Sequence, residues 1–222
     1  MFCVIFEVQP KDAQHRKAYL GHATELKAEL EQIDGFVDNE RFESRNHEGR
    51  VLSLSTWRDE KAVIRWRTLG HHHQIQEKGR FEIFADYYLR VGEITADSHV
   101  PDGGVLREQR FDETEIGNAK VATIVEVPPS ADGKPVEDAV RANVPVTGIA
   151  GLTDVEVFDS IYNPGKVLIL TGWRDETALA GAAHSSNGKS DIRRRTVRVV
   201  REYGMFERRE APQYYSPVER TT

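Results

Sequence analysis

Hydrophobic and polar positions alternate along several short stretches of this chain, and elsewhere apolar side chains recur every three or four residues. The alternation predicts strands at residues 2–9, 36–44 and 50–57. Apolar residues over 11–33 follow helical spacing and give that helix one face suited to covering a sheet. Gly35 follows, as a helix C-terminus favours. The apolar stripe consists of Tyr19, Ala23, Leu26, Leu30 and Ile33.

A second helix and a long strand complete this first set of elements. Asp59 is placed to cap a helix that runs through Trp66, breaks near Gly70 and continues to about Lys78. Residues 81–94 then predict a final strand. The resulting order, β-α-β-β-α-β, is that of a ferredoxin-like unit.

The pattern is then repeated within the chain. Residues 51–60, VLSLSTWRDE, return 116 positions later as residues 167–176, VLILTGWRDE. The same shift carries residues 35–44, GFVDNERFES, onto residues 151–160, GLTDVEVFDS, without a gap. An internal duplication explains this register, so the chain is predicted to contain two copies of one unit.

The duplication divides the chain into four parts. The first repeat spans residues 1–94 and the second spans residues 119–210, where the match to the last helix is poor. Residues 95–118 contain PDGG and read as a linker, and residues 211–222 form a polar tail that either wraps across the other half or is disordered. Each four-stranded sheet leaves one face uncovered by helices. An α+β fold in which the two ferredoxin-like repeats pack sheet to sheet within one chain is therefore expected.

Composition narrows the range of partners. The formal net charge of −6 gives no long-range attraction to a phosphate backbone, so nucleic acid is not the expected partner. No apolar run approaches the roughly 20 residues of a membrane span, and the first ten residues carry no basic leader. Cys3 is the single cysteine, which excludes an intrachain disulfide. These features favour a cytoplasmic protein.

The first repeat carries an ordered set of residues, namely Gly35, Phe36, Arg50, Val51, Trp57, Ala62, Trp66, His72, Gly79, Arg80 and residues 85–91. In order and spacing this set resembles the antibiotic biosynthesis monooxygenase domain of the dimeric α/β barrel superfamily. The resemblance implies an intrachain dimeric α/β barrel with clefts between sheet and helices. It implies a small-molecule oxidoreductase, a monooxygenase that needs no cofactor and acts on a phenolic or quinone-like compound. Further homo-oligomerisation stays open.

Trp66 and His72 are the leading catalytic candidates. A turn and a half of broken helix separates them, so both can face one cleft, where a histidine transfers protons at neutral pH. The structural alternative is that His72 pins the helix break while His71 and His73 are solvated. Three consecutive histidines point in three directions on a helix, so no metal site is predicted from them.

The resemblance also implies Asn, Tyr and Arg side chains around a phenolic substrate. Only one of Tyr87 and Tyr88 can face the helices, because side chains alternate along a strand. Ordinary packing or a cross-sheet ion pair is the alternative for each residue. The substrate-binding candidates are Asn39, Arg41, Tyr87, Tyr88 and Arg90.

Two alternative functions remain beside the monooxygenase. In the heme-degrading branch of the resembled family, an alignment on Trp66 puts Gln76 at the axial histidine and Glu7 near an essential asparagine. A heme-binding or heme-degrading protein would thus need unusual ligation. The other alternative is a non-catalytic ligand-binding accessory protein. No phosphate loop or dinucleotide fingerprint supports a flavin or nicotinamide cofactor.

The two repeats are not equivalent in chemistry. The shift of 116 places Ala182 opposite Trp66 and Gly188 opposite His72. The second repeat therefore lacks an indole and an imidazole at these positions. The larger or more polar cleft, and any catalytic site, is expected in the first half.

Overall fold

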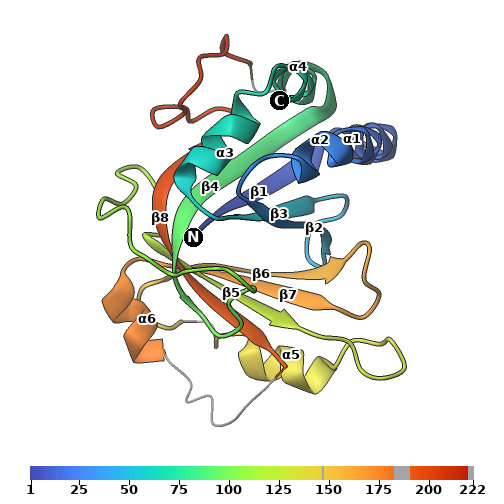
Figure 1. Cartoon of the computed structure of the whole chain (residues 1–222). Coiled ribbons are helices and arrows are strands. Elements are labelled where there is room, and N and C mark those ends of the chain that lie inside the picture. The colour runs from blue at the N-terminus through green and yellow to red at the C-terminus, as the bar shows by residue number, and fades with distance from the viewer. Residues whose placement is uncertain (147, 183–190, 220–222) are drawn as a thin grey trace.

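Eight antiparallel strands close into one barrel in the computed structural model, which describes residues 1–146, 148–182 and 191–219 (Figure 1). Around the barrel the strand order is β1-β3-β2-β6-β7-β5-β8-β4. The first half contains β1 (Phe2–Pro10), α1 (Ala13–Glu25), α2 (Lys27–Glu31), β2 (Phe36–Ser44), β3 (Val51–Trp57), α3 (Glu60–Arg67), α4 (Gly70–Lys78), the π-helical turn η1 (Gly79–Ile83) and β4 (Phe84–Asp97). The second half contains β5 (Val121–Val127), α5 (Glu137–Asn143), β6 (Leu152–Ser160), β7 (Val167–Trp173), α6 (Glu176–Ala182) and β8 (Arg193–Gly204).

Both halves thus follow the order strand, helix, strand, strand, helix, strand, and the barrel joins them edge to edge. One seam pairs β2 with β6, where Phe42 faces Ser160 and Ser44 faces Phe158. The other pairs β4 with β8 over a longer register that begins at Tyr88 opposite Gly204. Because both seams are hydrogen-bonded, the sheet of each half has no free edge, which removes a site for unwanted strand pairing.

The final strand of the first half differs from the sequence prediction at both ends. Residues 79–83 form a π-helical turn, so the strand begins at Phe84 and not at residue 81. Gly79 lies against the Phe84 ring, where an added Cβ would be 2.6 Å from a ring carbon. At the other end, pairing with β8 extends the strand to Asp97, so residues 95–97 of the predicted linker belong to β4.

The repeated motif makes the same local structure in both halves. Gly35 and Gly151 adopt φ values of +91° and +84°, a region that favours glycine. Their carbonyls accept hydrogen bonds from the N–H groups of Arg58 and Arg174, each at 2.8 Å. An added Cβ at Gly35 would lie 2.7 Å from the Ala62 side chain, so the turn also brings the next helix close to the strand.

The interior of the barrel is apolar in its central part and charged nearer its ends. Alternate residues of the strands point inward and form one cluster, including Phe42, Leu52, Phe158 and Leu168, which are at most 1% exposed.

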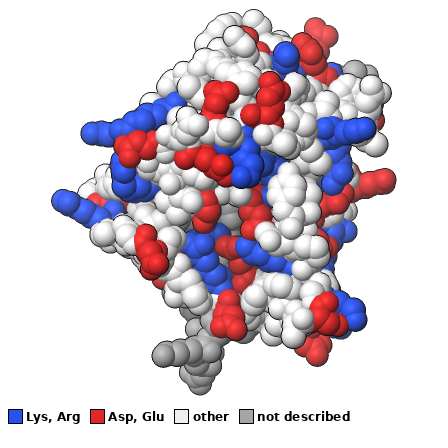
Figure 2. All heavy atoms as spheres, turned by 45° about the vertical axis from the view of Figure 1, so that its right-hand side comes forward, with Lys and Arg blue, Asp and Glu red and all other residues white. Residues whose placement is uncertain are grey.

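The predicted helix over residues 11–33 is interrupted at Leu26, giving α1 and α2. On the face shown in Figure 2, acidic and basic side chains are interspersed and form no large patch of a single sign.

Helices cover the outside of each half, and the C-terminal tail returns to the first half. α1 to α4 lie over the first half and α5 and α6 over the second (Figure 1). The tail after Glu210 reaches α4, where Tyr215 stacks on His73, and it reaches η1, where the Arg80 guanidinium donates to the Ser216 carbonyl at 3.0 Å. Of the two alternatives for the tail, wrapping across the other half is therefore the one observed for residues 211–219. No helix in the described part of the chain is long and apolar enough to cross a membrane.

Candidate functional site

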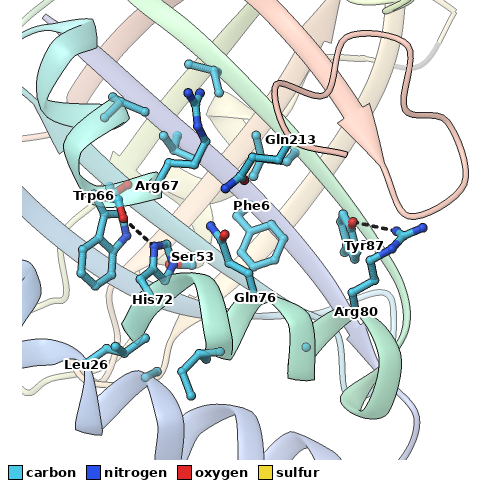
Figure 3. Close-up of a pocket in the computed structure, with 18 of the residues that line it drawn as sticks. Phe6, Leu26, Ser53, Trp66, Arg67, His72, Gln76, Arg80, Tyr87 and Gln213 are labelled. Carbon is cyan, nitrogen blue, oxygen red and sulfur yellow. Dashed lines mark hydrogen bonds between the residues drawn. The ribbon is translucent and has the colours of Figure 1, made fainter. Parts of the chain in front are cut away.

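A cleft of about 190 Å³ lies between the outer face of the first-half sheet and helices α1 to α4 (Figure 3). Trp66 and Arg67 stand at one end of it and Arg80 and Tyr87 at the other, with Phe6 and Gln76 between them. The sheet face and the amphipathic helices give the cleft its apolar lining, since both turn apolar side chains toward one another. This lining includes Val4, Phe6, Leu26, Leu30, Val63 and Leu89.

His72 lies on the indole of Trp66 at the break between α3 and α4. The two ring centroids are 4.0 Å apart with an interplanar angle of 17°. The imidazole Nδ1 donates to the backbone carbonyl of Trp66 at 2.9 Å, which assigns the proton to Nδ1 and leaves Nε2 as a free acceptor. Burial lowers the pKa of His72 to about 4, so the ring is neutral at pH 7.

The neighbouring histidines are bound elsewhere. His71 contacts the carboxylates of Glu29 and Glu25, and the hydrogen bond to Glu29 raises its pKa. His73 stacks against Tyr215 of the tail, whose hydroxyl lies 3.1 Å from its Nδ1. The prediction that the three rings point in three directions is confirmed. The structural alternative is met in part, because His72 binds the Trp66 carbonyl at the helix break. His71 is 34% exposed, and both it and His73 also bind a partner from another segment.

Three of the five substrate-binding candidates reach this cleft. Asn39, Arg41 and Tyr87 line it, together with Trp66 and His72. The Asn39 amide nitrogen is used by the sheet, since it donates to Ser53 Oγ at 3.1 Å and to the Leu54 carbonyl at 3.0 Å. Arg41 lies over the Tyr19 ring, 5.9 Å from its centroid, and its Nε is buried without a hydrogen-bond partner.

Tyr87 is held by two guanidinium groups. Its hydroxyl oxygen accepts from Arg80 Nη1 at 3.0 Å and from Arg208 Nη1 at 2.7 Å. Arg80 is 2% exposed and also donates to the Met205 carbonyl at 2.8 Å, so it fixes the end of the cleft. Since both lone pairs of the phenol accept, its O–H hydrogen is available to a third group, and the cations strengthen it as a donor.

Tyr88 and Arg90 do not reach this cleft, contrary to the placement predicted for them. Strand alternation turns both side chains toward the inside of the barrel, where they line a second hollow. There Arg90 lies over the Tyr88 ring, 5.0 Å from its centroid, and its Nη2 donates to Asp154 at 3.0 Å. Glu7 lines the same second hollow and is also separated from the cleft by the sheet.

Residues from the second half and the tail form part of the cleft. They were not predicted from the sequence. Strand β8 continues the outer face of β4, because Leu89 pairs with Tyr203 and Val91 with Arg201. A signal was present for Tyr203, which is the counterpart of Tyr87 at the repeat shift of 116. The tail residues had no such signal. The contributing side chains are Arg201, Tyr203, Arg208, Gln213 and Tyr215.

The corresponding part of the second half is only partly described. Ala182 ends the short helix α6, which has seven residues. Gly188, which the repeat places opposite His72, lies outside the described residues, as do its neighbours Asn187 and Lys189. Within the described ranges no group of three or more His, Cys, Asp or Glu side chains is arranged to hold a metal ion.

The closed barrel of two α+β halves, with a cleft between sheet and helices, places the chain in the dimeric α/β barrel class. The family model described as antibiotic biosynthesis monooxygenase matches residues 1–78. A relative from Pyricularia oryzae (strain 70-15), named jasmonate monooxygenase ABM, is 35% identical over 223 residues, covering 98% of this chain and 99% of the relative. The chain belongs to the antibiotic biosynthesis monooxygenase family.

Two solved structures illustrate the range of similar folds. An aldoxime dehydratase superposes with a TM-score of 0.53 at 13% identity, covering 89% of this chain and 81% of that one. An anthrone oxidase-like protein matches with a TM-score of 0.39 at 12% identity over 96% of both chains. The first likeness agrees with the barrel described above.

Proposed function

We propose that this chain is a monooxygenase that oxidises a small molecule in the first-half cleft, with His72 Nε2 as the proton acceptor and without a bound cofactor. One observation carries the proposal: the imidazole is neutral, its tautomer is fixed by the Trp66 carbonyl, and its second nitrogen is free in an apolar cleft. The substrate class is a phenol, or a related compound with an acidic C–H beside a carbonyl.

The chemistry needs a substrate that is its own reductant. Removal of a proton by Nε2 yields an electron-rich anion that reduces oxygen, and a CH₂ group plus O₂ then becomes a C=O group plus water. The Tyr87 hydroxyl is the donor that stabilises negative charge on the substrate oxygen, since Arg80 and Arg208 occupy its lone pairs. Trp66 keeps the imidazole flat against one wall of the cleft, which orients Nε2.

Jasmonate is a second test substrate, because the relative from Pyricularia oryzae carries its name. It is a cyclopentanone with acidic C–H groups beside the carbonyl, so the same base suits it. Oxidation of a CH₂ group to a carbonyl is balanced by O₂ alone. Hydroxylation would require a further two-electron donor, and dependence on an added reductant would identify that course.

The residues of the cleft do not fit the heme alternative. Gln76 supplies an amide where the alignment calls for an axial histidine. Glu7 lies in the second hollow, across the sheet from the cleft. A Soret band in the purified protein would contradict this assessment.

We also infer that the two halves are a fused pair of ferredoxin-like units. The first spans residues 1–97, with β4 extended to Asp97, and the second spans residues 119–210, joined by the linker 98–118, with residues 211–222 as a tail. The order of elements in both halves and the strand order 4-1-3-2 within each half support this division. In this arrangement the second half is the structural partner of a cleft that belongs to the first.

Oxygen uptake with an anthrone-type phenol and with jasmonate tests the proposal. His72→Asn keeps a donor near Nδ1 but lacks Nε2, and turnover should fall about 10²–10⁴-fold while the melting temperature changes little. His72→Gln places its amide nearer Nε2 and serves as the matched variant. Full activity in folded His72→Asn would remove His72 from the mechanism. Binding without oxygen uptake by the wild-type protein would instead favour an accessory protein.

A further inference from the structure

At Arg67 the first-half cleft carries a positive charge that has no ion-pair partner among the described residues. Arg67 ends α3 and lines the cleft beside Trp66. Its Nε is buried and has no hydrogen-bond partner. No ion pair within 4 Å joins Arg67 to a carboxylate in the described part of the chain, although most other arginines of the first half have one. Arg67 is therefore held in place without a counter-ion.

Glu60, the carboxylate whose charge acts on Arg67, is already engaged by other guanidinium groups. Both oxygens of Glu60 accept from Arg110 Nη1, each at 2.8 Å. Arg201 of β8 approaches the same carboxylate at 3.9 Å. Glu60 thus serves two guanidinium groups, and its charge reaches Arg67 only at longer range. Arg67 and Arg201 together bring more positive charge to this end of the cleft than Glu60 offsets.

This arrangement has an energetic cost that a ligand would relieve. Burial lowers the pKa of Arg67, and the charge of Arg201 lowers it further. A partly buried cation without a partner loses hydration and gains no ion pair in exchange. An anionic group entering from the cleft would supply the missing charge and would accept from the planar fork of the guanidinium.

We propose that Arg67, with Arg201 beside it, binds the carboxylate of a small and otherwise apolar organic acid in the first-half cleft. The inference rests on the proposed function and narrows its substrate class to acids. The apolar lining of the cleft fits the body of such a molecule. Its carboxylate fits the positive charge of Arg67 at the Trp66 end of the cleft. With its carboxylate at Arg67, the body of the acid extends across Phe6 toward Tyr87 (Figure 3).

A carboxylic acid and its methyl ester separate the effect of the ligand's charge on binding from the effect of its shape. Jasmonate and methyl jasmonate differ in the carboxylate alone, and their binding is measured by fluorescence titration, since Trp66 lies in the cleft. The wild-type protein should bind the acid roughly 10–100-fold more tightly than the ester, as expected for a hydrogen-bonded ion pair in a partly buried site. Equal affinities would overturn the proposal.

Three variants test whether the preference for the acid over the ester depends on Arg67. Arg67→Gln should lose the preference for the acid while binding the ester as before, which also reports that the cleft is folded. Arg67→Lys keeps the charge without the fork and should retain part of the preference. Arg65→Gln is the control, because Arg65 lies on the same helix but pairs with Asp34 on the outside. An acid preference that survives in Arg67→Gln, or disappears in Arg65→Gln, contradicts the assignment.

The test is independent of turnover. Binding of both ligands is measured without oxygen consumption, so failure of the monooxygenase proposal would leave the acid preference intact. In the reverse case, oxygen uptake with an uncharged phenol and no preference for the acid would keep the monooxygenase and remove the carboxylate site.

Discussion

Replacing His72 by asparagine should flatten the pH dependence of stability between pH 7.5 and pH 5. Burial lowers the pKa of this imidazole to about 4 in the folded chain, whereas an unperturbed histidine titrates near 6.5. Between these values the unfolded chain binds more protons than the folded one. The contribution of His72 to stability is therefore lost as the pH falls from about 6.5 toward 4.

The size of the effect follows from the two pKa values. One pKa unit corresponds to about 1.36 kcal/mol. Acidification to pH 5 covers about 1.5 units of the interval between the unfolded pKa and the folded pKa. This gives about 2 kcal/mol lost by the wild-type chain at pH 5 relative to neutral pH. The side chain is partly exposed, so a loss of about 1–2 kcal/mol is the expected outcome.

Urea unfolding at pH 7.5, 6 and 5 measures the difference. The asparagine amide can still donate to the Trp66 carbonyl, so the substitution removes the titration and keeps the contact at Nδ1. Other shifted groups, such as Glu202 with its pKa raised to about 7 by burial, occur in both proteins and cancel. Identical pH dependence in wild type and His72→Asn would refute the lowered pKa.

His71 provides a control of opposite sign. Its pKa is raised by the hydrogen bond to Glu29, so its stabilising contribution is present at low pH and is lost as the pH rises through its folded pKa. His71→Asn should therefore make the loss of stability on acidification steeper. A flattening in both variants would show that the measurement does not distinguish the two environments.

Three further predictions concern stability and ligand binding. Gly35→Ala should cost about 2 kcal/mol in urea unfolding, because φ is +91° and the new Cβ would meet a side-chain carbon at 2.7 Å; Gly21→Ala, with open space around it, should instead gain about 0.5–1 kcal/mol. Tyr215→Ala, which removes the tail side chain that stacks on α4, should raise KM about tenfold in the oxygen-uptake assay with little change in Tm. Arg195→Met should cost about 2 kcal/mol in urea unfolding, because the buried Glu126 loses its arginine and keeps Lys166.

The barrel strands could be predicted because the alternating apolar pattern that marks them occurs in both repeats. The alternation over residues 2–9 and 36–44 identified β1 and β2 almost to their ends, and the repeat gave β6 and β7 in the same register. The end of β4 could not be found in this way. Its last residues are strand because Ala96 and Asp97 pair with β8, and that pairing depends on how the two halves meet.

The candidate site was predictable on the helix side and not on the strand side. Trp66 and His72 follow from a helix break that the sequence shows. The choice between Tyr87 and Tyr88 required the structure, since β4 has one face in the barrel and the other in the cleft. Both faces are at least half-buried from Tyr87 to Ile94 and carry apolar and polar side chains, so periodicity alone does not say which face meets the helices.

The tail was the largest omission from the predicted site. Residues 211–219 are polar and lack periodicity, yet Arg208 and Arg80 hold them by donating to the Gln213 and Ser216 carbonyls at 2.8 Å and 3.0 Å. These contacts depend on backbone carbonyls, which every residue carries, so no side-chain pattern marks them in advance. The role of the tail in the cleft is therefore recognised only in the structure, where the positions of Arg80 and Arg208 are known.

The seam between β2 and β6 shows how one chain maintains two different halves. The backbone keeps the pseudo-twofold relation, since Arg45 N–H donates to the Val157 carbonyl and Ile161 N–H donates to the Arg41 carbonyl, both at 2.9 Å. The side chains do not, because Arg45 binds Asp159 whereas its counterpart Ile161 is apolar. In a symmetric dimer every substitution appears in both clefts. Fusion removes that constraint, so the first half can keep Trp66 where the second has Ala182.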